Sequence, residues 1–337
     1  MNKMDMVHIY LDSLEYRSSI ILLSCGSFPD RVSISFKSRA WIGSHMQVAH
    51  DFKIISACPT VFREDQAISY GETADVLDFL DRIGISAVAL FLFGGEYYRL
   101  SLQEKKEMMD LLMRSTNFRG EFLIGVNDIS LNAVLDLARY AYRSDASAII
   151  ISPPNYVPFY SPRRSFVEHF LAKIIENSGI SAIFQDTDLP DSLLPRIEFW
   201  KKYAESEKIS GFKIEGKKAV ERMKDIRAYY PDKKIYGGYL GLNLTEEIAA
   251  GSNGSIIGSS IPDLVSRDLL RRAEDKSGIL RKFLNFEVSH LSIFVEIEKY
   301  ILKKRGVLEN FRCRDPCPHL SKLQMAKIDH LYSEMIP

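Results

Sequence analysis

Short apolar runs alternate with longer stretches of helical periodicity along most of this chain. The runs cover residues 53–58, 86–93, 121–126, 147–152, 180–185, 209–213, 233–236 and 254–258. They are continuously apolar rather than alternating, which is typical of strands buried on both faces in a parallel sheet. The pattern therefore predicts eight parallel strands.

Helix-start signals stand between these runs. Ser101 followed by Glu104 has the spacing of a capping box, in which each side chain binds the other residue's backbone amide. Ser130 precedes a second helical stretch, and a serine–proline pair at residues 161–162 precedes a third. These signals predict that helices connect the strands.

Eight strand-plus-helix units predict a (β/α)8 TIM barrel over residues 51–274. An open doubly wound sheet is the alternative, but no G-x-G-x-x-G motif follows the first run. Residues 275–337 are predicted to form a C-terminal helical region, with helices near 283–304 and 322–335. Residues 1–50 mix strand-like runs with Gly, Ser and Pro, so we expect either a small accessory element or partial disorder.

The charge balance narrows the possible partners. Among 337 residues, 44 Lys and Arg balance 44 Asp and Glu, whereas capture of nucleic acid or anionic lipid needs a positive excess. The sequence also contains no apolar window of about 18 residues, the length needed to span a membrane, and acidic residues precede the first short apolar run, unlike a signal peptide. We therefore expect a cytoplasmic protein with no nucleic-acid or membrane partner.

The cysteines give no sign of a disulfide scaffold or a metal. There are four, Cys25, Cys58, Cys313 and Cys317, too few and too scattered for a disulfide framework. Cys313 and Cys317 lie near His319, but a zinc site needs a further ligand pair at suitable spacing, and none is visible. We expect two thiols in a C-terminal turn, no metal and no cofactor.

Lys213 is the main chemical candidate, because active sites of TIM barrels lie at the C-terminal ends of the strands. It ends the sixth apolar run, after Gly211 and Phe212. Apolar neighbours disfavour an ammonium, and a neutral amine can attack a ketone to form a Schiff base. The alternative is a lysine that extends past the strand end into water. Tyr156, after the fourth run, is either a proton relay or a tyrosine packed on the rim.

Glycines at other strand ends suggest how an anion could be held. Gly94 and Gly95 follow the second run, where backbone amides can approach a carboxylate, although a tight turn also needs glycine. Glycines after the seventh and eighth runs could mark a phosphate site. No Lys or Arg stands beside them, so carboxylate binding is favoured over phosphate binding.

Five segments of the chain stand out together. In chain order they are residues 58–62 (CPTVF), 95–101 (GEYYRLS), 153–156 (PPNY), 211–213 (GFK) and 314–316 (RDP). As a set they resemble the dihydrodipicolinate synthase / N-acetylneuraminate lyase family of Schiff-base lyases. They are similar to the family's Thr-Pro-Phe, Gly-Glu…Leu-(Ser/Thr), Pro-Tyr-Tyr, Gly-(Ile/Phe)-Lys and Arg-x-Pro segments. Aromatic residues after Gly-Glu, and Tyr-Gly-Gly at 236–238, resemble the 5-dehydro-4-deoxyglucarate dehydratase branch.

The resemblance implies a class I aldolase or dehydratase in which Lys213 forms an imine with a 2-oxo acid such as pyruvate and Tyr156 relays protons. It also implies a homo-oligomer, either a tetramer or a dimer. The substrate-binding residues that it implies are Phe93, Gly94, Gly95, Gln185, Gly238 and Ile257.

Two departures from the family pattern keep a second function open. Residues 92–96 read Leu-Phe-Gly-Gly-Glu where the family has Gly-Thr-Thr-Gly-Glu, so the hydroxyl that passes protons to the tyrosine is replaced by Phe93 or Gly94. Residues 184–187 replace the family's Tyr-Asn-x-Pro, and the arginine that follows in dihydrodipicolinate synthases is absent. The alternative is a weakened or inactive paralogue with a binding or regulatory role.

Overall fold

The computed structural model describes residues 6–9, 20–23, 52–154, 163–271 and 278–336. The chain forms two compact units, residues 1–50 and residues 51–337. In the first unit, β1 (Met6–Ile9) pairs with β2 (Ile20–Leu23) in an antiparallel sheet. These strands agree with two of the strand-like runs expected there.

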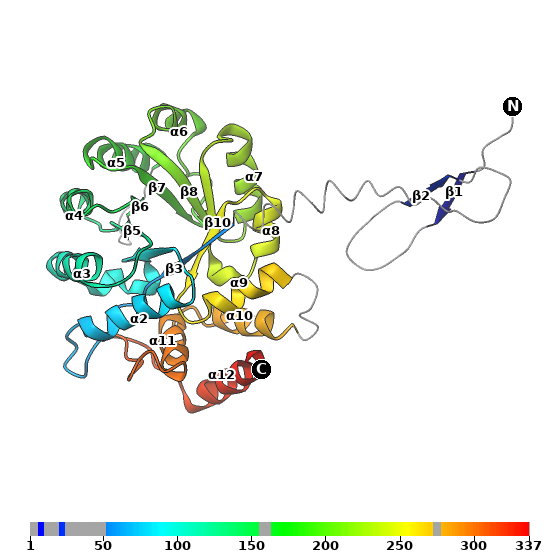
Figure 1. The fold of residues 1–337 in the computed structure, drawn as a ribbon. Coiled ribbons are helices and arrows are strands. Elements are labelled where there is room, and N and C mark those ends of the chain that lie inside the picture. The colour runs from blue at the N-terminus through cyan, green and yellow to red at the C-terminus, as the bar shows by residue number, and fades with distance from the viewer. Residues whose placement is uncertain (1–5, 10–19, 24–51, 155–162, 272–277, 337) are drawn as a thin grey trace, which may run out of the picture. The chain divides into compact units, whose positions relative to one another are not determined.

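The second unit is a closed barrel of eight parallel strands, which confirms the predicted TIM barrel (Figure 1). Its strands are β3 (Lys53–Ala57), β4 (Ala87–Leu90), β5 (Glu121–Gly125), β6 (Ala148–Ile151), β7 (Ala182–Thr187), β8 (Ile209–Glu215), β9 (Lys234–Gly237) and β10 (Gly254–Gly258). Each strand pairs with its neighbour in sequence, and β10 closes the barrel against β3.

Helices follow the strands and surround the barrel (Figure 1). They are α2 (Tyr70–Arg82), α3 (Leu102–Ser115), α4 (Leu131–Arg143), α5 (Arg164–Asn177), α6 (Ile197–Ala204), α7 (Ala219–Tyr229), α8 (Leu244–Ala249) and α9 (Pro262–Arg271). The Ser101–Glu104 capping box opens α3, and the Ser130 hydroxyl accepts a hydrogen bond from the Ala133 amide at the start of α4. The cap expected at residues 161–162 lies outside the described residues.

The C-terminal region contains α10 (Ile279–Ser289), α11 (Phe294–Lys304) and α12 (Lys322–Met335), which gather on one side of the barrel (Figure 1). The single helix predicted near 283–304 is wrong, because the chain breaks between α10 and α11. At the break, the Ser289 hydroxyl donates to the carbonyl of Phe286 at 2.8 Å. Such local bonds compete with the helical ladder and favour its end.

Strand alternation divides the apolar residues into two cores. One fills the barrel with small and branched side chains, including Ile55, Ala89, Ile150, Ile183 and Ile256. The other lies between the strands and the surrounding helices. Because successive strand residues point to opposite sides, the inward positions also determine which polar side chains reach the C-terminal mouth of the barrel.

Candidate active site

Lys213 lies near the C-terminal end of β8, on the inner side of the barrel. In the strand register it pairs with Gln185 on β7 and with Tyr236 on β9. Tyr236 packs against the cluster that fills the barrel, so this layer of side chains faces inward. Only 4% of Lys213 is exposed. The lysine therefore does not extend into bulk water.

A carboxylate lies directly against the Lys213 ammonium. Glu215 Oε2 is 2.5 Å from Lys213 Nζ, and Glu215 stands two residues further along β8, on the same face of the strand. The sequence predicts apolar neighbours for this lysine, and that expectation missed the carboxylate. β8 continues beyond residue 213, so its alternation brings Glu215 to the same side.

The Glu215 carboxylate is fixed by two further donors. Gln185 Nε2 donates to Oε2 at 2.8 Å, and the Tyr239 amide donates to Oε1 at 3.1 Å. Burial alone would raise the pKa of Glu215, but the Lys213 charge and these hydrogen bonds outweigh it and lower the pKa. Glu215 is therefore ionised beside the lysine at neutral pH.

The glycine pair after β9 makes room for two acidic side chains. A Cβ on Gly238 would stand 2.1 Å from Glu215 Oε1, and a Cβ on Gly237 would stand 1.8 Å from Glu247 Oε2. Glu247, on α8, is 1% exposed, and its Oε1 accepts a hydrogen bond from the Gly238 amide at 3.4 Å. Burial raises the pKa of Glu247 to about 7. At this pKa the carboxyl is about half protonated at neutral pH.

A second carboxyl pair lies at the end of β10. Glu298 accepts hydrogen bonds from the amide and hydroxyl of Ser260, at 2.8 and 3.0 Å, and fills the space that Gly258 leaves. Burial and the neighbouring Glu298 raise the pKa of Glu287 well above its ordinary value. Acidic side chains thus fill the space beside the glycines at the ends of β9 and β10. This arrangement disfavours the binding of a phosphate there.

The residues after β4 form a turn at the rim. The amides of Gly95 and Glu96 donate to the carbonyls of Leu92 and Phe93, at 2.9 and 3.0 Å. These two amides are used within the turn, and the predicted role of Gly94 and Gly95 in holding a carboxylate stays a prediction. Phe93 is 51% exposed and stacks on Phe294, with ring centroids 5.3 Å apart.

The structure brings together some of the predicted site residues and separates others. Gln185 and Gly238 both lie against Glu215 and therefore beside Lys213. Ile257 belongs to the outer core, in contact distance of Gly241, on the opposite face of β10 from the inward Ile256. The structure does not bring Ile257 to the lysine.

A cavity of about 220 Å³ opens between the loops that follow β4, β5 and β6. Its lining includes Tyr98, Lys105, Asn127 and Ser152, but the described lining does not include Lys213. Burial lowers the pKa of Lys105. The Nζ atom of this lysine lies over the Tyr97 ring, 5.6 Å from the ring centroid.

The comparisons with known proteins identify the family. The Dihydrodipicolinate synthetase family matches residues 51–331, most of the chain. The chain belongs to this family. An N-acetylneuraminate lyase of Histophilus somni is 24% identical over 281 residues, covering 78% of this chain and 91% of the relative. A DapA-like lyase of Thermococcus onnurineus is 27% identical over 105 residues, covering 31% of this chain and 36% of the relative.

Solved structures of family members share the fold. A dihydrodipicolinate synthase from Rhodopseudomonas palustris matches with a TM-score of 0.74 and 20% identity, covering 85% of this chain and 98% of that one. An N-acetylneuraminate lyase from Fusobacterium nucleatum matches with a TM-score of 0.72 and 19% identity, covering 85% and 99%. With its relatives, the family match makes this chain a lyase of the dihydrodipicolinate synthetase family.

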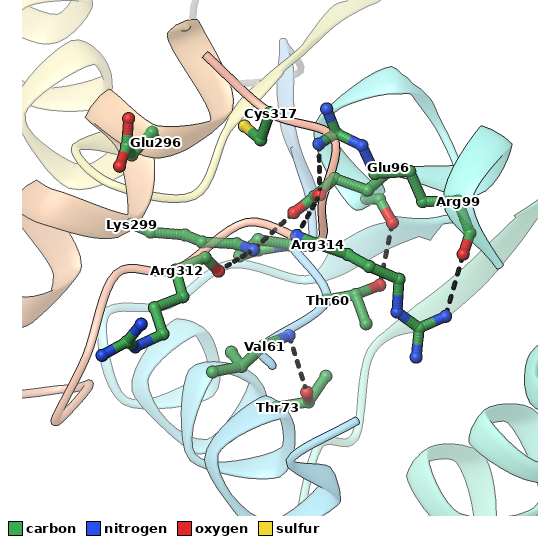
Figure 2. Close-up of polar contacts among 12 residues, drawn as sticks. Thr60, Val61, Thr73, Glu96, Arg99, Glu296, Lys299, Arg312, Arg314 and Cys317 are labelled. Carbon is green, nitrogen blue, oxygen red and sulfur yellow. Dashed lines mark hydrogen bonds and ion pairs between the residues drawn. The ribbon is translucent and has the colours of Figure 1, made fainter. Parts of the chain in front are cut away.

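In this family member, the Gly-Glu and Arg-Asp-Pro segments meet in a buried polar network (Figure 2). Glu96 is fully buried, binds Lys299 Nζ through Oε1 and accepts from Arg99 Nη1 through Oε2 at 2.6 Å. The Arg314 amide also donates to Oε2, at 3.2 Å, while its guanidinium binds Glu104. The network ties α11 and the C-terminal segment to the loop after β4, so these motif residues stabilise the fold.

Tyr156 lies outside the described residues, so its predicted role stays a prediction. Among the described residues, no group of three His, Cys, Asp or Glu side chains is placed to hold a metal. No helix in the described parts of the chain is long and apolar enough to span a membrane.

Sequence reasoning missed Glu215 and the buried acids around it. The signal for Glu215 was present, because a residue two positions after an inward lysine shares its face if the strand continues. No comparable signal marks Glu247 or the Glu287–Glu298 pair. Their burial follows from the packing of α8, α10 and α11 against the strand ends.

Proposed function

We propose that this lyase binds a 2-oxo acid and forms a Schiff base with it through Lys213. The observation that carries the proposal is the buried lysine at the C-terminal end of β8, in the inner layer of a barrel of this family. A Schiff base becomes a cationic iminium, which withdraws electrons from the adjacent carbon–carbon or carbon–oxygen bond and so favours its cleavage. Both an aldolase and a dehydratase can use this intermediate.

The surroundings of Lys213 restrict the substrate. Glu215 is ionised and Glu247 lies on the other side of the Gly237–Gly238 pair. These acids disfavour a second anionic group at the end of β9, so we propose a substrate whose single carboxylate points away from them. We propose that two of the predicted substrate-binding residues, Gln185 and Gly238, contact a ligand bound to Lys213, because both lie against Glu215. Tyr156 is proposed as the proton relay on the substrate side.

Borohydride trapping tests the proposal. The protein is incubated with pyruvate and other 2-oxo acids, reduced with borohydride, digested and analysed by mass spectrometry. We expect a stable adduct on the peptide containing Lys213, absent from Lys213→Ala and retained in Lys218→Ala, whose lysine is half-exposed and paired with Asp191. A panel of 2-oxo acids that leaves no adduct on Lys213 would contradict a Schiff-base mechanism.

A binding or regulatory role is the second candidate, and Phe93 favours it. The exposed ring at the rim has no proton to transfer, in a position where the resemblance implies a hydroxyl. Calorimetry separates the candidates: a 2-oxo acid that binds wild type and Lys213→Ala equally, without trapping, identifies a binding protein. We further propose a cytoplasmic homo-oligomer, tested by cell fractionation and by light scattering.

A further inference from the structure

We propose that Glu215 is a catalytic residue that takes the ammonium proton of Lys213 and returns it to the substrate oxygen that leaves as water. This inference rests on the Schiff-base function proposed above. The Glu215 Oε2–Lys213 Nζ distance of 2.5 Å allows direct proton transfer. Among the described residues, no other carboxylate lies within ion-pair distance of this nitrogen.

The contacts of Glu215 hold the carboxylate in one orientation. Oε2 faces Lys213 and also accepts from Gln185, while Oε1 is held by the Tyr239 amide. Gly238 leaves the space in which the carboxylate stands. A surface ion pair rarely has donors on both oxygens and a fitted space, so this arrangement resembles a positioned acid–base group.

The proton balance closes without any further reagent. The Lys213 ammonium gives a proton to Glu215, and the resulting amine attacks the ketone carbon of the 2-oxo acid. The former carbonyl oxygen acquires a proton from nitrogen, which gives a neutral carbinolamine, and then the proton from Glu215. A carbon–oxygen bond breaks, water leaves, and a carbon–nitrogen double bond forms. Ammonium and ketone thus become iminium and water, and Glu215 ends as a carboxylate.

The charge balance favours the same assignment. A cation on the lysine nitrogen faces Glu215 both before the reaction, as ammonium, and after it, as iminium. The carboxylate therefore stabilises the product as it stabilises the resting state. The lowered pKa of Glu215 keeps it a carboxylate in the resting pair, which is the form that can accept the lysine proton.

The test compares the rate of borohydride-trappable imine formation between pH 6 and pH 9 in wild type and Glu215→Gln. We expect the variant to be slower by on the order of 10²- to 10⁴-fold at pH 7, the range for loss of a general acid–base group. Its rate should rise steeply with pH, because solvent must then remove the lysine proton. Glu221→Gln, an exposed acid on the following helix, is the matched control and should keep the wild-type rate.

Two further measurements keep this test decisive. Glu215→Asp keeps the charge but moves the carboxylate away from Lys213, and we expect a rate of imine formation between those of wild type and Glu215→Gln. If circular dichroism shows that Glu215→Gln does not fold, the Glu215→Asp variant is used for the test in its place. A Glu215→Gln rate that falls without a change in pH profile shows a purely structural role and overturns the inference. A wild-type rate and profile in Glu215→Gln also overturns it while leaving the Schiff-base function intact, whereas absence of any wild-type adduct overturns the function itself.

Discussion

Replacing Glu247 by glutamine removes a buried titrating group while nearly preserving its size. Burial raises the pKa of Glu247 from an ordinary 4.5 to about 7. The folded state therefore holds this proton more tightly than the unfolded state. The stability that Glu247 contributes is fully present below pH 4.5 and is lost as the pH rises through 7.

The size of the effect follows from the two pKa values. A separation of about 2.5 units corresponds to about 3.4 kcal/mol at 1.36 kcal/mol per unit. A group titrating between these values changes the free energy of unfolding by about 2.5 kcal/mol from pH 5 to pH 8. Glutamine does not titrate, so the wild type should lose about 2.5 kcal/mol relative to Glu247→Gln over this interval.

Urea unfolding followed by circular dichroism at pH 5, 6, 7 and 8 measures this difference. Subtracting the free energy of unfolding of the variant from that of the wild type cancels the contribution of other acids, including the Glu287–Glu298 pair. The control is Glu246→Gln on the exposed side of the same helix, which should track the wild type. If wild type and Glu247→Gln differ by a constant amount at all four pH values, Glu247 does not titrate as its burial implies.

Two substitutions test the other contacts. Lys299→Met leaves the buried Glu96 carboxylate with one cation fewer. We expect the free energy of unfolding to fall by about 3–5 kcal/mol, the range for breaking a buried ion pair. A loss under about 1 kcal/mol in urea unfolding would argue against a stabilising pair. Gly238→Ala places a methyl group 2.1 Å from Glu215 Oε1. Imine trapping at Lys213 should then slow by on the order of 10²-fold, the effect of a misplaced catalytic group, while Gly71→Ala, with no atom within 4 Å of the added carbon, should not change it.

The strands and their order could be predicted because a parallel barrel leaves a local signature in the chain. Most strand residues are buried on both faces of the sheet, so a short apolar run marks each strand. Local backbone conformation and hydrogen bonding determine where individual strands and helices end. β4 ends at Leu90, earlier than the apolar run at residues 86–93 suggests, because Phe91 adopts a left-handed conformation with φ of 57°. The break between α10 and α11 likewise depends on bonds at Ser289 rather than on apolar spacing.

Lys213 could be selected from its position and from the family resemblance, but its surroundings could not. Whether Glu215 meets Lys213 depends on how far β8 continues. The pairing of β8 with β7 extends as far as Glu215 and Thr187, and this pairing sets the length of β8. The space for that carboxylate comes from Gly238 on another strand. A motif specifies residue types at fixed spacing and says little about which acid from another segment fills the volume beside them.

The sequence by itself determined the barrel, its strand order and the lysine at a strand end, because these follow from short-range periodicity and from motifs a few residues long. Only the tertiary structure decided which charges meet. Glu96 and Lys299 stand 203 residues apart yet form a fully buried pair, and Glu247 is enclosed beside Gly237 from a different element. The protonation of a carboxyl depends on its burial and its neighbouring charges, which are properties of packing in three dimensions.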